Sequence, residues 1–203
     1  MLESLVIEQC APTLAGMKTG NLFSYFFDSK ADAKREFEDI NTKLNARGVV
    51  AEPLLWKESR VLVYVYRRSR LENDLKEKQV VEILERYGYE VNQWGNYSCN
   101  KNQLYRREKS ENICDICLEK LKDRLESCEG FPHEIGVFLG YPVSDVIGFI
   151  NHKGENCKAS GLWKVYDNEN ETLKLFAKLQ RCTRVYLKVF AEGRSITQMT
   201  VVA

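Results

Sequence analysis

The residues best suited to acid–base or metal chemistry lie in residues 131–154, a segment rich in glycine that holds both histidines of the chain. His133 and Glu134 follow Pro132 in the stretch FPHEIG and are expected at the opening of a helix. A histidine there can serve as an acid, a base or an axial ligand to haem iron. We therefore treat His133 as the candidate metal ligand, with local packing as the alternative. HEIGV is not a zinc helix, because Val137 stands where the second histidine is required.

The loop CAPTLAGMKTG offers a second set of polar and reactive groups. It lacks the spacing of a phosphate loop, yet small residues with one lysine can hold an anion through backbone N–H groups. Thr13 and Lys18 are therefore expected at a ligand, unless the loop is a plain connector. Cys10 can be a nucleophile if its pKa is depressed, with His133 as its base and Glu134 as the orienting group.

The pair Cys114 and Cys117 has the C-x-x-C spacing of metal and redox sites, and Cys99 and Cys128 could complete four thiolates. The pair also belongs to a stripe of cysteines and leucines at the three- and four-residue spacing of a helix. A buried thiol behaves as a small hydrophobe. We therefore expect these cysteines in the core, with a metal or cluster site as the alternative.

The stretch GLWKVYD alternates side chains in the manner of a strand that packs on one face. Its other face presents a lysine and a tyrosine, and aromatic residues on a sheet can stack a planar cofactor or simply cover the sheet. We expect a ligand pocket where this strand meets residues 10–20 and residues 133–141. The ligand-binding residues predicted for this pocket are Thr13, Lys18, Arg67, His133, Glu134, Tyr141, Trp163, Lys164 and Tyr166.

Hydrophobic periodicity predicts the elements that must position these groups. Expected strands cover residues 21–27, 49–56, 60–67 and 159–167, and the third is apolar on both faces, which indicates a central strand. The expected helices are 2–10, 28–48, 69–87, 111–130, two short helices separated by Gly-Tyr-Pro, and 168–193. The order is typical of ferredoxin-like folds. We expect an α+β fold with about four strands in an antiparallel or mixed sheet, helices on one face and a helical elaboration before the last strand.

Composition narrows the class of protein further. The 203 residues carry a net charge of +1, with acidic and basic residues interspersed, so we expect no nucleic-acid partner. No apolar run approaches the roughly 20 residues of a membrane span and no signal peptide is visible, so we expect a cytoplasmic protein without a membrane partner. Seven cysteines in such a chain indicate free thiols. One α+β domain over residues 1–203 is expected, with a helical and polar elaboration at about 89–154.

Four blocks together, CAPTLAGMKTGNLFSY, VYVYR, FPHEIGVFLGYPVSDVIGFI and GLWKVY, resemble an uncharacterised family of anaerobic Gram-positive bacteria, domain of unknown function 3793. The likeness runs from about Cys10 to Thr200 and is weakest over Asn92–Glu129. The resemblance implies gene neighbours of the flavodoxin and ferrous-iron uptake kinds, and hence an accessory role in iron or redox physiology. It also implies haem, a flavin or iron as the cofactor and a flavodoxin-type protein as a partner.

Three functions follow from these residues and stay open at this point. The first is a small-ligand-binding accessory protein, in which His133 contacts the ligand. The second is a Cys/His-dependent group-transfer or hydrolytic enzyme, with Cys10, His133 and Glu134 as catalytic candidates. The third is a module that binds a flavodoxin or a regulator through the polar residues 92–110.

Overall fold

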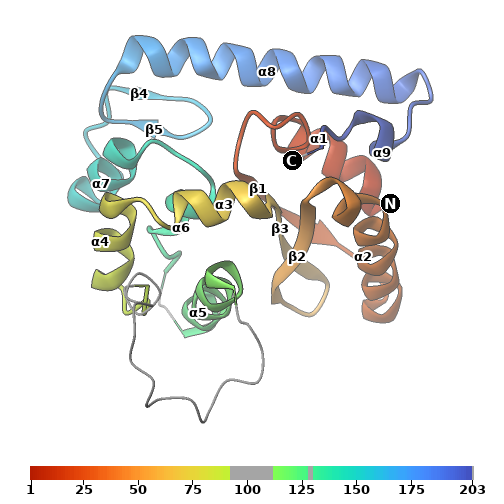
Figure 1. Ribbon diagram of the computed structural model, residues 1–203, viewed down its shortest axis with the longest axis horizontal. Coiled ribbons are helices and arrows are strands. Elements are labelled where there is room, and N and C mark those ends of the chain that lie inside the picture. Colours follow the sequence, from red (N-terminus) through yellow and green to blue (C-terminus); the bar gives the residue numbers. More distant parts are fainter. Residues whose placement is uncertain (92–111, 128–129, 203) are drawn as a thin grey trace, which may run out of the picture.

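A three-stranded antiparallel sheet forms the centre of the computed structural model, which describes residues 1–91, 112–127 and 130–202 (Figure 1). Its strands are β1 (Gly20–Phe26), β2 (Val49–Trp56) and β3 (Arg60–Arg67), in the spatial order β1-β3-β2. The predicted central position of β3 is confirmed. Its valines face one hydrophobic cluster and its tyrosines face another, because both faces of the strand are apolar.

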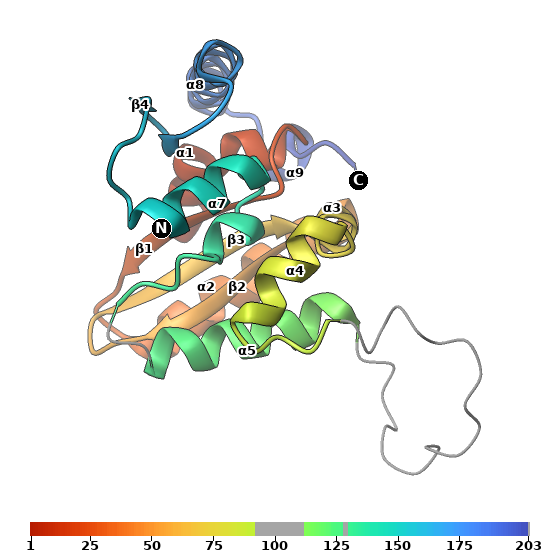
Figure 2. The same cartoon turned by 90° about the vertical axis from the view of Figure 1, so that its left-hand side faces the viewer.

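Helices cover both faces of this sheet, so the prediction of helices on one face is wrong (Figure 2). A strand with two apolar faces exposes one of them to water unless each face is covered. One hydrophobic cluster includes side chains of α1 (Leu2–Leu14), α2 (Lys30–Leu44) and α9 (Ile196–Met199). The other includes side chains of α3 (Arg68–Asp74), α4 (Lys78–Arg86), α5 (Ile113–Ser127), α6 (Ile135–Phe138) and α7 (Val143–His152).

The expected fourth strand is the main error of the predicted topology. Residues 159–167 form a separate two-stranded hairpin of β4 (Ala159–Ser160) and β5 (Lys164–Val165), which does not join the central sheet. The segment turns at Gly161, and the carboxylate of Asp145 accepts the backbone N–H groups of the two residues that follow β5. The fold is therefore α+β with a small three-stranded sheet and a hairpin, rather than a four-stranded ferredoxin-like sheet.

The long helix α8 (Glu169–Ala191) runs along the top of the molecule in Figure 1, from the hairpin to α9. Near its start, Phe176 and Leu179 pack against Trp163 and Val165 of the hairpin segment. Its length and its position after the hairpin confirm the predicted helix 168–193. A capping box at Ser195 begins α9, as the sequence SITQ predicts.

Two predicted helix boundaries need correction. Helix α1 continues through Pro12 to Leu14, because its buried face packs against β1 and α8 and this packing outweighs one missing backbone hydrogen bond. The expected helix 69–87 is two helices, α3 and α4, separated by a turn at residues 75–77. A 3₁₀ turn, η1 (Asn45–Arg47), ends at Gly48 in the left-handed conformation and leads from α2 into β2.

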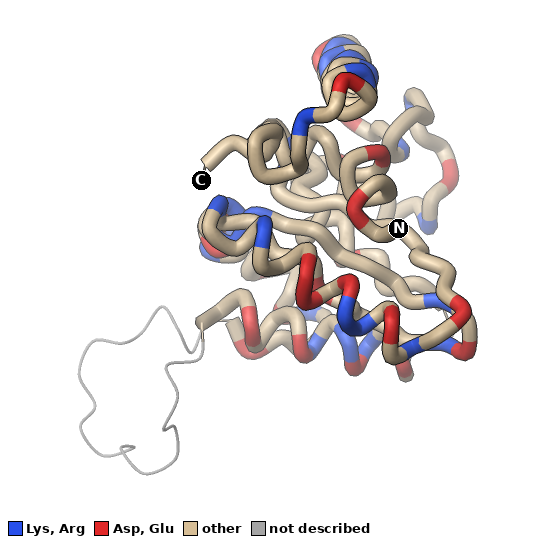
Figure 3. The backbone as a smooth tube through the Cα atoms, turned by 90° about the vertical axis from the view of Figure 1, so that its right-hand side faces the viewer, with Lys and Arg blue, Asp and Glu red and all other residues tan. Residues whose placement is uncertain are grey.

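Charged side chains are interspersed on the helix surfaces. Figure 3 shows acidic and basic residues alternating on α2, and the same alternation occurs along the sequence of α8. Among the described residues, no helix combines the length and the apolar character needed to cross a membrane.

The start of β1 allows a test of this packing. A Cβ atom on Gly20 would lie 2.4 Å from the ring of Tyr64, which is fully buried and donates a hydrogen bond from its hydroxyl to the carbonyl of Phe138. We expect Gly20→Ala to lower the free energy of unfolding by about 1–3 kcal/mol, the usual cost of an overpacked core. Urea unfolding measures the change, with Gly130→Ala as the control because no atom lies within 4 Å of its added Cβ. Equal stability of the two variants would contradict the packing.

Candidate functional site

A pocket of about 360 Å³ lies between residues 131–149 and residues 160–164. Its volume falls in the range of small-molecule sites, which are mostly apolar with a few polar groups. Apart from the aromatic residues and His133, its polar side chains are Asp145, Ser160 and Lys164. The lining residues are Phe131, Pro132, His133, Ile135, Gly136, Tyr141, Asp145, Val146, Phe149, Ser160, Gly161, Leu162, Trp163 and Lys164.

Aromatic side chains brace the walls of this pocket. The rings of Tyr141 and Trp163 stack with their centroids 4.7 Å apart, and Phe176 of α8 meets the indole edge-on at 4.5 Å. His133 packs edge-on against Phe149 at 5.1 Å. Such ring pairs fix side-chain orientation beyond the burial of area alone. The walls are therefore held in place by residues of three separate segments.

The Gly-Tyr-Pro turn between α6 and α7 places Tyr141 at the pocket. Gly140 has a positive φ of 66°, and a Cβ atom there would lie 2.5 Å from the hydroxyl oxygen of Thr19. Glycine is thus required both for the left-handed backbone and for the close approach to the loop before β1. Pro142 then precedes α7, whose first turn carries Asp145.

Asp145 is the buried polar group of the pocket, and the sequence interpretation missed it. Its side chain is 2% exposed and accepts a hydrogen bond of 2.8 Å from the indole Nε1 of Trp163. Its other oxygen accepts the backbone N–H groups of Tyr166 and Asp167 at 2.8 and 3.1 Å. The sequence did contain a signal, because an acid within the most apolar stretch of the chain needs a buried partner.

Four of the predicted ligand-binding residues line this one pocket, namely His133, Tyr141, Trp163 and Lys164. A fifth, Lys18, reaches the same wall from the loop before β1, with its ammonium 4.8 Å from the centroid of the Tyr141 ring. Lys164 donates from its ammonium to the carbonyl of Gly154 at the rim. The structure therefore joins the glycine-rich block and the Trp163 segment at one pocket. Residues 10–14 belong to α1 instead of a loop, and of residues 10–20 only Lys18 contacts a wall of the pocket, at the Tyr141 ring.

Arg67 and Thr13 serve the fold in this structure. The guanidinium of Arg67 donates to the carbonyls of Thr13 and Leu14 at 2.6 Å each, and to the carbonyl of Val201 at 2.8 Å. It thereby binds the C-terminal end of α1 to the C-terminal segment of the chain. The hydroxyl of Thr13 donates to the side chain of Asn21 at 2.7 Å. Neither residue lines the pocket.

Glu134 and Tyr166 also lie away from the pocket lining. The carboxylate of Glu134 is fully buried, pairs with the guanidinium of Arg124 and accepts a hydrogen bond from the hydroxyl of Tyr89 at 3.2 Å. The ring of Tyr166 stacks on His152, with centroids 5.6 Å apart. Glu134 is adjacent to His133 in sequence, but its hydrogen bonds are directed to α5 and to Tyr89.

Cys10 lies fully buried in the hydrophobic cluster between α1, α2 and the sheet. Burial raises the pKa of the Cys10 thiol well above its ordinary value, and the nearby Lys18 only partly opposes this. A nucleophilic cysteine requires the opposite shift together with solvent access. Burial also lowers the pKa of Lys18, to about 8.

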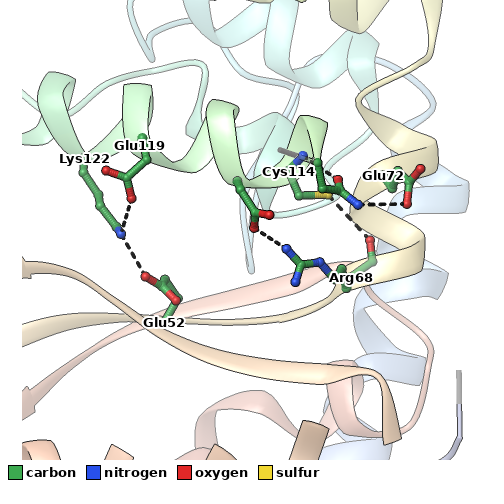
Figure 4. Close-up of polar contacts among 8 residues, drawn as sticks. Glu52, Arg68, Glu72, Cys114, Glu119 and Lys122 are labelled. Atoms are coloured by element: carbon green, nitrogen blue, oxygen red, sulfur yellow. Dashed lines mark hydrogen bonds and ion pairs between the residues drawn. The ribbon is translucent and has the colours of Figure 1, made fainter. Parts of the chain in front are cut away.

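The C-x-x-C pair occupies the core, as the interpretation of its helical stripe predicts. Cys114 and Cys117 are buried on the inner face of α5, and burial raises the pKa of both thiols to about 12. Figure 4 shows the thiol of Cys114 directed at the carbonyl of Arg68, 3.8 Å away, while Lys122 pairs with Glu52 on β2. Cys99 and Cys128 lie outside the described residues, and within residues 1–91, 112–127 and 130–202 no cluster of three metal-ligating side chains occurs.

A second pocket of about 660 Å³ lies beside α3 and α4. Its lining includes Val91 and Asn112, the two residues that border residues 92–111. The predicted partner-binding residues 92–110 lie outside the described part of the chain. We therefore place no site there.

Comparison with known proteins gives a family and no activity. No curated protein and no solved structure matches the chain. The model of the family described as "Protein of unknown function (DUF3793)" matches residues 6–200, nearly the whole sequence. The match includes every block that carries the resemblance, so the predicted family is confirmed, whereas its restriction to anaerobic Gram-positive bacteria stays a prediction. The chain therefore belongs to the DUF3793 family.

Proposed function

We propose that this protein binds a small ligand with an apolar or aromatic body in the pocket between residues 131–149 and the β4–β5 hairpin. The observation that supports this is the convergence of aromatic walls with few polar groups on one pocket of about 360 Å³. Phe131 and Leu162 at this pocket are 49% and 45% exposed, so apolar surface remains open to a ligand. Burial of such surface drives binding.

The proposed role is that of an accessory protein, linked to iron or redox physiology by the family resemblance alone. Haem, a flavin and iron make different demands on the pocket. A planar ring suits its aromatic walls, and His133 is the residue that would contact a haem iron. Bare iron lacks a supporting donor set, because the described residues contain no group of three His, Cys, Asp or Glu side chains suited to a metal ion.

The burial of Cys10 argues against the alternative of a Cys/His-dependent enzyme. A thiol with a raised pKa inside a hydrophobic cluster supplies little thiolate at neutral pH. Glu134, the group expected to orient His133 in that mechanism, is engaged with Arg124. The ligand-binding proposal needs neither group.

Replacing His133 tests the proposal, and His152 provides the matched control. His133 lines the pocket and packs on Phe149, whereas His152 stacks on Tyr166 outside the lining. We expect His133→Ala to bind the retained ligand at least tenfold more weakly, a change of about 1.4 kcal/mol, while His152→Ala binds it normally. Protein purified without oxygen is compared by native and denaturing mass spectrometry, and an absorption spectrum distinguishes haem or flavin from a colourless ligand.

Circular dichroism provides the folding control for both histidine variants. Equal ligand retention by the wild type and His133→Ala would contradict the assignment of His133. Retention of a ligand by a variant whose pocket is blocked, such as Gly136→Trp, would place the ligand elsewhere.

A further inference from the structure

We infer that the ligand of this pocket is an organic cation, held by the carboxylate of Asp145 and by the aromatic walls. The inference rests on the proposed function, because it names the chemical class of ligand for the same pocket. A pocket that selects cations would not accept the phosphate groups of flavin nucleotides or the propionate groups of haem next to Asp145.

The first observation is a buried acid without a cationic side chain paired to it. Asp145 is 2% exposed and lines the pocket, and the described residues include no ion pair to its carboxylate. A carboxylate offers about four acceptor positions, whereas Asp145 accepts three N–H bonds, only one of them on Oδ2. A buried charge is costly unless it is compensated. The three N–H groups and the first turn of α7 stabilise the carboxylate in part, and a cation in the pocket would add the charge that they lack.

The second observation is the chemistry of the walls. Aromatic rings carry negative charge on their faces and attract cations within about 6 Å of the ring centre. Phe131, Tyr141, Phe149 and Trp163 all line this pocket. The protein already uses one of these rings in this way, because the ammonium of Lys18 lies 4.8 Å from the centroid of Tyr141.

The two basic side chains of the pocket do not outweigh Asp145. Lys164 and His133 are exposed, and the ammonium of Lys164 is engaged with the carbonyl of Gly154. Exposed charges are screened by water and salt, whereas a buried charge is screened much less. Lys18 is buried against the Tyr141 ring but does not line the pocket, so Asp145 is the buried charge that a ligand in the pocket would contact, and its sign favours a cation.

Three probes of nearly the same shape test the charge of the ligand. Choline carries a positive charge, 3,3-dimethylbutan-1-ol is its neutral isostere, and 3,3-dimethylbutanoate is an anion with the same branched end. Isothermal titration calorimetry of the full chain measures the binding of each probe. We expect choline to bind at least tenfold more tightly than the alcohol, and the anion to bind most weakly.

Two variants test whether the carboxylate of Asp145 causes the preference for choline. Trp163→Phe removes the indole N–H but keeps the charge of Asp145, so the preference for choline should persist. The double variant W163F/D145N removes the charge without placing an amide N–H against the indole N–H, and the preference should fall to within twofold. The asparagine oxygen can still accept the N–H groups of Tyr166 and Asp167, and thermal melting verifies folding.

The outcomes separate this inference from the proposed function. If the alcohol or the anion binds as tightly as choline, the inference is overturned while a small-ligand pocket stands. If the double variant keeps the full preference for choline, Asp145 is not its source and the inference is likewise overturned. If no probe binds, the inference also fails, and the retention experiment on His133→Ala decides the proposed function by itself.

Discussion

Lys18→Met is expected to raise the free energy of unfolding at pH 7 by about 1–2 kcal/mol. The lysine is 9% exposed, and among the described residues it makes no ion pair or hydrogen bond. Burial lowers its pKa from 10.5 to about 8, and a shift of this size costs about 3 kcal/mol of stability at about 1.4 kcal/mol per unit. The contact with the Tyr141 ring, which methionine would lose, offsets about 1–2 kcal/mol.

The pH dependence distinguishes this effect from simple repacking. Between pH 8 and 10.5 the unfolded chain binds more protons at Lys18 than the folded chain, so this residue makes wild-type stability rise with pH in that window. The advantage of Lys18→Met should be constant below pH 8 and shrink up to pH 10.5. Buried thiols and tyrosines titrate in both proteins, so the difference between the two isolates Lys18.

Urea unfolding at pH 7, 8, 9 and 10 measures that difference. Lys76→Met serves as the control, because Lys76 has a side chain 57% exposed and pairs with Glu72, four residues earlier in the chain. Its replacement should change stability by no more than about 0.5 kcal/mol at any pH. A Lys18→Met protein that is less stable than the wild type at pH 7 would mean that the ammonium has a stabilising partner.

Local patterns predict the elements of this fold better than they predict its topology. The two apolar faces of β3 and the cysteine–leucine stripe of α5 are periodic features within single elements, and both predictions are confirmed. The expected fourth strand fails because its hydrogen-bonding partner is Asp145, about twenty residues earlier in the chain. Such a side-chain to backbone contact leaves no periodic signal in one sequence.

The same distinction applies to the candidate site. Four residues predicted to bind a ligand do line one pocket. Two of them are the aromatic residues Tyr141 and Trp163, which follow glycines in turns, and the others are His133 and Lys164. Arg67 instead hydrogen-bonds carbonyls as far as 134 residues away in the sequence, a pairing that residue type and spacing do not indicate. Residue type alone therefore predicts a ligand contact for Arg67 and Glu134, whereas their partners lie within the chain itself.

Arg124→Met is expected to lower the free energy of unfolding by about 3–5 kcal/mol. The guanidinium pairs with Glu134, whose side chain has no exposed area, and it also lies 4.8 Å from the ring of Tyr87. Removing one partner leaves a buried carboxylate that, among the described residues, keeps the hydroxyl of Tyr89 as its side-chain hydrogen-bond donor. An uncompensated buried charge of this kind costs several kcal/mol.

The double variant R124M/E134Q separates the charge from the other contacts of Arg124. It should recover more than half of the lost stability in urea unfolding, because a neutral amide is less costly to bury than a carboxylate. Lys122→Met is the control on the same helix, since its pairs with Glu52 and Glu119 are partly exposed and should contribute no more than about 1 kcal/mol. A double variant as unstable as Arg124→Met would assign the effect to packing instead.

The single variant Glu134→Gln tests whether Glu134 orients His133. If Glu134 oriented His133 for chemistry or binding, Glu134→Gln would weaken ligand retention while stability stayed unchanged. The observed hydrogen bonds to Arg124 and Tyr89 predict the reverse, a loss of stability with unchanged ligand affinity in the folded protein. This ion pair joins α5 to the start of α6, so we expect the contribution of Glu134 to be to helix packing and stability.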